Sequence, residues 1–203
     1  MANADASFGL KLIGHKSGSP FNALIKKCYI ASSYGTALYQ GDPVKFSGTS
    51  NTAAVSSGLE VHDIGCLPGI EKCAAGSGNV VAGVIVGFEP IVRSATAPYN
   101  PASTERVALV CVDPDAKYLI QADGSVAASD VLANANLIFT NAGSTSTGQS
   151  GVELDTSSMT TTAAYQLKIL GFSKVYGRNA VGNWAVLEVG INNHYLSAST
   201  AGL

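Results

Sequence analysis

Short apolar runs, each bounded by turn-forming residues, are the feature that most limits what this chain can fold into. The two strongest runs cover residues 79–88 and 106–112, and both are apolar at odd and even positions alike. Alternating side chains of a strand point to opposite faces, so each run reads as a strand that is buried on both sides. Glu89-Pro90 ends the first run, and Asp113-Pro114-Asp115 ends the second. Both endings are turn signals.

Further runs of the same kind follow along the chain. We expect residues 117–121 to form a second strand, closed by Asp123-Gly124, and to make a hairpin with 106–112. Other strands are expected at 27–31, 44–46, 137–140, 162–172 and 184–192. A single helical turn fits 125–136, with Ser129 as its N-cap. About nine short strands with almost no helix predict an all-β fold. We expect a β-barrel or β-sandwich, jelly-roll-like, with at most one short helix.

The N-terminal segment has a different character. Between residues 7 and 22 three glycines and a proline break any periodic pattern, and the apolar residues are scattered. We expect an extended arm over residues 1–22 and a single β domain over residues 23–203. Phe8, Leu10, Leu12 and Phe21 are then the candidate contacts with a neighbouring subunit. The alternative is a chain end that contacts nothing.

Charge is scarce for a chain of 203 residues. Charged residues make up 13% of it, about half of the roughly 25% that is usual in soluble domains. We therefore expect part of the surface to be buried against other chains. A surface rich in serine, threonine, asparagine and glycine is the alternative.

The balance and placement of charge argue against two classes of partner. The net charge is −2, and the largest basic cluster is Lys26-Lys27. Binding to nucleic acid without sequence preference needs more lysine and arginine. The N-terminus lacks the basic and apolar regions of a signal peptide, and no apolar run reaches the roughly twenty residues that span a bilayer. We expect no nucleic-acid partner, no membrane partner and synthesis in a cytoplasm.

Cysteine, histidine and aspartate suggest a metal site only weakly. Cys66 and Cys73 follow His62 and Asp63, but structural zinc sites use more closely spaced cysteine pairs. A disulfide or an ordinary loop are the other interpretations, and the loop is preferred. A second acidic group, Asp113, Asp115 and Asp123, suggests calcium, although aspartate at strand ends more often forms turns. We expect no metal and no cofactor.

Catalytic patterns are also weak. No serine lies in a Gly-x-Ser-x-Gly elbow, and neither His15 nor His194 has a motif partner. Glu153 and Asp155 share one face of a strand and suggest a glycosidase pair, but an exposed strand edge is the preferred interpretation. We expect no enzyme and no catalytic residues.

Several segments carry a resemblance to a known family. They are Met1–Ala4, Tyr39–Val44, Tyr99–Arg106, Val112–Asp115, Ile120–Gly124, Asn141–Thr145, Ser150–Ser158, Gln166–Leu170 and Ile191–His194. Together they cover much of the chain, and they resemble a family of virion structural proteins of tailed bacteriophages.

The resemblance implies a head decoration, or cement, protein. Such a protein is a β-barrel subunit, typically a homotrimer, on the outer surface of the head over the joints between major capsid proteins. The implied partners are the major capsid protein and further copies of the chain, and the implied location is the virion. The resemblance brings no catalytic residues. Two alternatives stay open: a tail or neck component, and a glycan-binding β-sandwich module that uses the polar loop 141–151.

Overall fold

The computed structural model describes residues 3–18, 24–90, 97–174 and 179–197. Their regular structure is almost entirely β. The strands are β1 (Lys11–His15), β2 (Ile25–Ile30), β3 (Pro43–Ser50), β4 (Val55–Ser56), β5 (Val61–His62), β6 (Pro68–Lys72), β7 (Gly83–Phe88), β8 (Arg106–Cys111), β9 (Ala116–Gln121), β10 (Ser125–Val126), β11 (Asn134–Ile138), β12 (Glu153–Thr160), β13 (Leu167–Phe172), β14 (Gly182–Asn183) and β15 (Val186–Ile191). The predicted all-β class is confirmed. Within the described ranges, no helix is long and apolar enough to cross a membrane.

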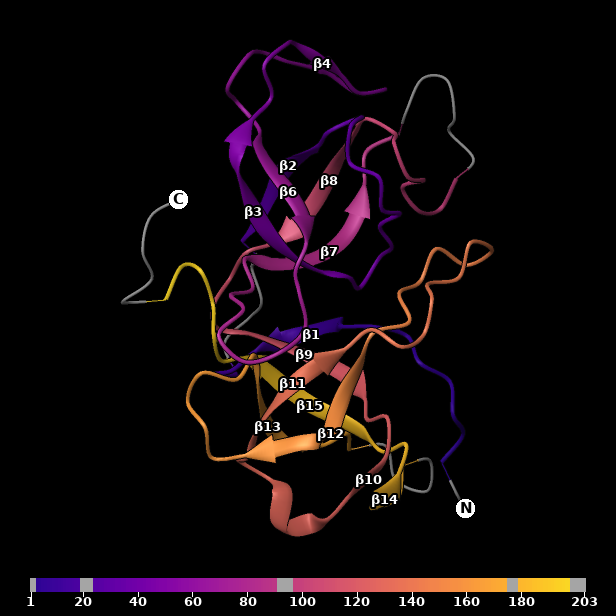
Figure 1. Ribbon diagram of the computed structural model, residues 1–203, viewed down its shortest axis with the longest axis vertical. Helices are drawn as coiled ribbons and strands as arrows, with labels where there is room; N and C mark the ends of the chain where they lie inside the picture. The colour runs from indigo at the N-terminus through magenta and orange to yellow at the C-terminus, as the bar shows by residue number, and fades with distance from the viewer. Residues whose placement is uncertain (1–2, 19–23, 91–96, 175–178, 198–203) are drawn as a thin grey trace.

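Five strands close into a barrel, in the upper half of Figure 1. Their order is β2-β6-β3-β7-β8; β2 runs parallel to β6, and the other neighbours are antiparallel. Inward-facing side chains fill the barrel with one apolar cluster, which includes Ile30, Val44, Ile70, Ile85 and Val110. Closure leaves none of these five strands with a free edge.

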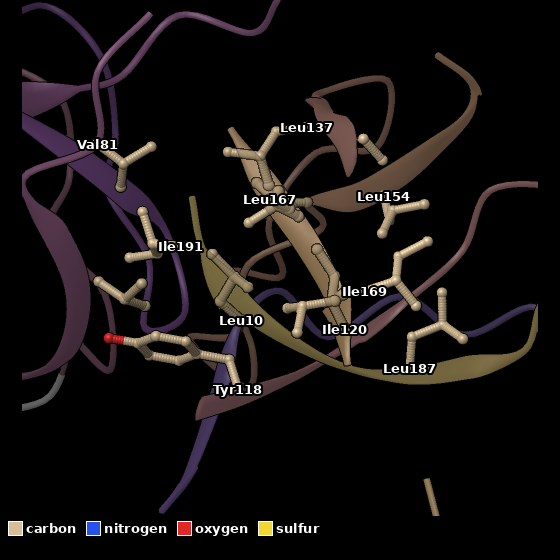
Figure 2. Close-up of a cluster of buried hydrophobic side chains, with 14 of the residues drawn as sticks. Leu10, Val81, Tyr118, Ile120, Leu137, Leu154, Leu167, Ile169, Leu187 and Ile191 are labelled. Carbon is tan, nitrogen blue, oxygen red and sulfur yellow. The ribbon is translucent and has the colours of Figure 1, made fainter. Parts of the chain in front are cut away.

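The other large sheet lies below the barrel in Figure 1. Its strand order is β1-β9-β15-β13-β11-β12. Leu154 in β12 also bridges Ala122, just after β9, so the sheet curls back toward its own second strand. Figure 2 shows the side chains that fill the curl, among them Tyr118, Leu167 and Leu187.

The barrel and the curled sheet share one core. The largest apolar cluster contains sheet residues together with Cys73, Val81, Val84 and Cys111 from the barrel and its connections. A bridge between Val81 and His194 links the two parts directly. Because this shared core excludes water, the barrel and the sheet stabilise each other.

The structure differs from the expected free arm. Residues Lys11–His15 form β1, the edge strand of the curled sheet, paired antiparallel with β9. Leu10 is 2% exposed and lies in the core. The register shifts between Leu12 and Gly14, and such an irregularity hides a strand from pattern reading. The predicted boundary after residue 22 falls outside the described residues.

The expected helical turn is present but is capped differently. It is a 3-10 turn, η1 (Ala128–Asp130), and it follows Ala127 at the N-cap position. The prediction of Ser129 as N-cap is wrong, because Ser129 lies inside the turn. The Asp130 carboxylate reaches back instead and accepts a hydrogen bond from the Ala127 N–H at 2.7 Å.

A glycine in β7 allows the close approach of β8. A Cβ added at Gly83 would collide with the carbonyl oxygen of Cys111 and lie 2.8 Å from Cγ1 of Val110. Gly83→Ala is therefore expected to destabilise the fold by about 2 kcal/mol through overpacking, measured by urea unfolding. Gly87→Ala in the same strand is the control, since its added Cβ would meet only Cδ1 of Leu109, at 3.9 Å. Equal effects of the two substitutions would contradict this explanation.

Candidate functional site

The far end of the barrel carries an excursion between β3 and β6. It contains the small hairpin β4–β5, at the top of Figure 1, on the side of the barrel away from the curled sheet. Buried Asn51 closes its base: the side-chain amide donates to the carbonyls of Ala53 and Asp63, and the side-chain oxygen accepts from the N–H of Leu67. These three bonds hold both ends of the excursion together.

The turn of the hairpin is also fixed by hydrogen bonds. The Ser57 hydroxyl oxygen accepts from the N–H groups of Leu59 and Glu60, at 3.3 and 3.2 Å. The Ser57 N–H donates to the Glu60 carbonyl, and the Gly58 N–H donates to the Pro90 carbonyl. The turn is therefore tied to the chain that leaves β7.

The two faces of the hairpin have opposite roles. Val55 pairs with His62 in register, and Val55 packs inward in a small apolar cluster with Leu67 and Val107. The outward residues are apolar too: Leu59 is 72% exposed, Val61 70% and Ile64 64%. We call these three side chains the hairpin face. Large aliphatic side chains exposed along one protruding excursion are typical of a protein contact surface.

A set of charged side chains lies beneath the hairpin. Glu89 follows β7 and is 3% exposed. Its Oε1 lies 2.6 Å from the Lys27 ammonium of β2, and its Oε2 lies 3.2 Å from Nε2 of His62. Glu60 pairs with the same lysine, and its Oε1 lies 3.6 Å from His62 Nε2. We call Lys27, Glu60, His62 and Glu89 the ion cluster.

The ion cluster keeps a buried carboxylate charged. Burial alone would raise the pKa of Glu89, but hydrogen bonds from Lys27, Ser57 and His62 together outweigh burial and lower the pKa. The backbone at Glu89 is held as well, because its carbonyl accepts a hydrogen bond from Nε of Arg106 at 2.9 Å. Glu89 is thus a fixed negative charge at the base of the hairpin.

In the part of the chain that the structure describes, two groups of side chains have donor atoms close enough to hold a metal ion. One consists of Glu60, His62 and Glu89, and its donor atoms lie within 4.8 Å of one another. The ammonium of Lys27 already contacts both of these glutamates, so the geometry is that of an ion-pair network. The other group is His15, Asp113 and Asp115, where Lys16 lies 3.9 Å from Asp115.

The weaker metal and catalytic patterns are not assembled. Among the described residues the cysteines are free: Cys66 is exposed, and Cys73 lies in the shared core. Asp123 accepts hydrogen bonds from Thr156 instead of joining Asp113. The expectation that Glu153 lies on an exposed edge is wrong: it is buried, burial raises its pKa, and it accepts a hydrogen bond from Asn141.

Three of the four predicted contact residues do come together. Phe8, Leu10 and Leu12 line a groove of about 610 Å³ between the barrel and the curled sheet, with Ile85 and Leu119 among its other lining residues. Leu10 belongs to the core of its own chain, so in this conformation it is not free to anchor a neighbour. Phe21 lies outside the described residues.

The sequence indicates strand fragments around residues 59–64 but not their exposed apolar face, because the pattern is inverted. In 59–62 apolar and polar residues alternate, and such alternation normally places the apolar residues inside. Here the apolar residues Leu59 and Val61 face solvent, while Glu60 and His62 belong to the ion cluster and contact Lys27 and Glu89. The signal that was available is the alternation itself, which marks a strand without saying which face is buried.

The fold and the site together define an all-β protein with a closed barrel that presents a braced apolar hairpin. No family model, no curated protein and no solved structure matches the chain.

Proposed function

We propose that this protein is a bacteriophage capsid decoration, or cement, protein. It binds the outside of the head shell as a homotrimer and stabilises the shell by clamping neighbouring major capsid proteins. The observation that carries the proposal is the hairpin face, three large aliphatic side chains exposed at 64–72% on the tip of a closed barrel. The resemblance to virion structural proteins supports the same assignment.

Burial of the hairpin face supplies the binding free energy. Transfer of one large aliphatic side chain from water to an apolar environment contributes roughly 1.5–3 kcal/mol. Three such side chains in one contact are enough to change affinity by several powers of ten, since each 1.4 kcal/mol is a factor of ten. The low charge of the chain, 13%, lowers the cost of removing the surrounding surface from water.

Stabilisation of the shell then follows from mass action. A subunit that binds the assembled shell but not its separated capsid proteins adds its binding free energy to the stability of the shell. This function needs rigidity and contact area, and it requires no catalytic group.

The proposal predicts that the hairpin face is necessary for decoration. The triple variant Leu59→Ser, Val61→Ser, Ile64→Ser is expected to bind expanded shells that lack the protein at least about 1,000-fold more weakly, because each of the three lost apolar contacts costs about a factor of ten or more. Co-sedimentation measures the affinity. Unfolding free energy should change by less than about 1 kcal/mol, since the three side chains already face water.

A matched control separates this contact from a general loss of apolar surface. Leu132 and Val181 are exposed at 67% and 57% and lie outside the barrel. The variant Leu132→Ser, Val181→Ser is expected to decorate shells normally. Equal binding by the triple variant and the wild type would refute the role of the hairpin, and imaging that places the protein at a vertex or tail would refute the decoration function itself.

A further inference from the structure

We infer that the ion cluster is a positioning device that orders the hairpin before docking and sets the direction of the hairpin face. The ordering of the hairpin is argued from the geometry of the isolated protein. The effect on shell binding rests on the proposed function.

The cluster ties the hairpin to two separate barrel strands. Glu60 and His62 come from the hairpin, Lys27 comes from β2, and Glu89 follows β7. Their neighbours Leu59 and Val61 project to solvent. Since adjacent residues of a strand point to opposite faces, inward fixation of His62 in β5 turns Val61 outward, and the bond between Glu60 and Lys27 fixes the turn that carries Leu59.

The hairpin is short, and its other anchors are the Asn51 bonds at its base and one backbone bond from the Gly58 N–H to the Pro90 carbonyl. β4 and β5 are two residues long each, and an isolated two-stranded hairpin is marginally stable at best in water. Val55 is the hairpin-strand residue that enters an apolar cluster. The ion cluster therefore supplies the side-chain connections between the hairpin and barrel residues Lys27 and Glu89, beside the backbone bond from Gly58 to Pro90.

Order before binding has a direct effect on affinity. A loop that is fixed only on binding loses conformational freedom at that moment, and this loss reduces the net binding free energy. A tip already held by the ion cluster avoids that loss. Glu60, His62, Lys27 and Glu89 thus act on binding through the hairpin, without contact to the shell.

The test removes the two cluster side chains that the hairpin contributes, Glu60 and His62, and keeps Lys27 and Glu89. In Glu60→Ala, His62→Ala the buried Glu89 carboxylate loses its contact with His62 but keeps Lys27 as its counter-ion, so the fold should persist. Amide hydrogen exchange over residues 58–64 of the isolated protein is expected to become about tenfold faster, because a loosened hairpin opens more often. Shell binding is expected to weaken about tenfold, and global unfolding should change little.

Two further variants make the result specific. Glu71→Ala breaks the exposed Lys45–Glu71 pair on the barrel and should leave exchange at the hairpin unchanged. Glu60→Gln, His62→Gln keeps hydrogen-bonding side chains at both positions and should restore most of the protection.

The outcomes separate this inference from the proposed function. Unchanged exchange at residues 58–64 would overturn the positioning role, and so would faster exchange with unaltered shell binding. If the wild type fails to bind shells at all, the decoration function is refuted, and so is the predicted effect of the ion cluster on shell binding. The exchange measurement on the isolated protein still decides whether the cluster orders the hairpin.

Discussion

Replacement of Lys72 by methionine is expected to destabilise the protein by about 3–5 kcal/mol, the usual cost of removing one partner of a buried ion pair. The lysine ammonium lies 3.0 Å from Oδ1 of Asp42, a carboxylate that is fully buried. Without it, Asp42 keeps two hydrogen-bond donors, the Ser150 hydroxyl at 2.7 Å and the Tyr39 N–H at 2.8 Å. Neither donor carries a charge, so the buried carboxylate loses its counter-ion.

The position of Asp42 explains why the loss should spread beyond one strand. The neighbouring Gly41 carbonyl accepts from the N–H of Leu10, just before β1, and the Gly41 N–H donates to the Ile85 carbonyl in β7. Ser150 precedes β12 and donates its backbone N–H to Gln40. One turn thus connects the barrel to both ends of the curled sheet, and its disturbance loosens the junction.

Two variants test the explanation by urea unfolding. Lys45→Met removes a lysine from the adjacent barrel strand whose partner, Glu71, is exposed, and it should cost less than about 1 kcal/mol. Asp42→Asn combined with Lys72→Met removes both charges and should recover much of the lost stability. Equal effects of Lys45→Met and Lys72→Met would show that the burial of Asp42 does not matter.

The strands buried on both faces were predictable from the sequence. β7 is apolar throughout, β8 is apolar from Val107 to Cys111, and turn residues follow both strands. A continuous apolar run indicates that both faces of its own strand are buried. It does not indicate which other strands lie beside it. The barrel closure, which pairs β2 with β6 and β8, depends on contacts between distant segments.

The candidate site shows why the rest could not be predicted. The ion cluster joins residue 27, residues 60 and 62, and residue 89. The spacing of these residues along the sequence does not indicate that their side chains meet. The sequence Gly41-Asp42-Pro43 indicates a turn, yet a turn residue gives no sign that its carboxylate will be buried against Lys72. Sequence reasoning located such residues but not their partners.

Acid is expected to weaken the junction between barrel and sheet through His194. The ring is 1% exposed; its Nδ1 accepts a hydrogen bond from the Leu196 N–H, and among the described residues its Nε2 has no hydrogen-bond partner. Burial, assisted by the positive charge of Lys16, lowers the pKa of His194 to about 4, although Asp113 and Asp115 oppose the shift. The bridge from His194 to Val81 places this uncharged ring where the two parts of the fold meet.

The direction of the pH effect follows from where the proton binds. Between pH 6.5 and about 4 the unfolded chain protonates this histidine while the folded protein does not, so stability falls as the pH falls through that window. The full loss is on the order of 3 kcal/mol.

His194→Asn keeps an acceptor for the Leu196 N–H but cannot take up the proton, so its unfolding free energy should depend less steeply on pH. Urea unfolding at several pH values between 7 and 4.5 measures the difference, and His15→Asn, at a more exposed ring, should follow the wild type. Parallel curves for wild type and His194→Asn would show that another group governs the acid sensitivity.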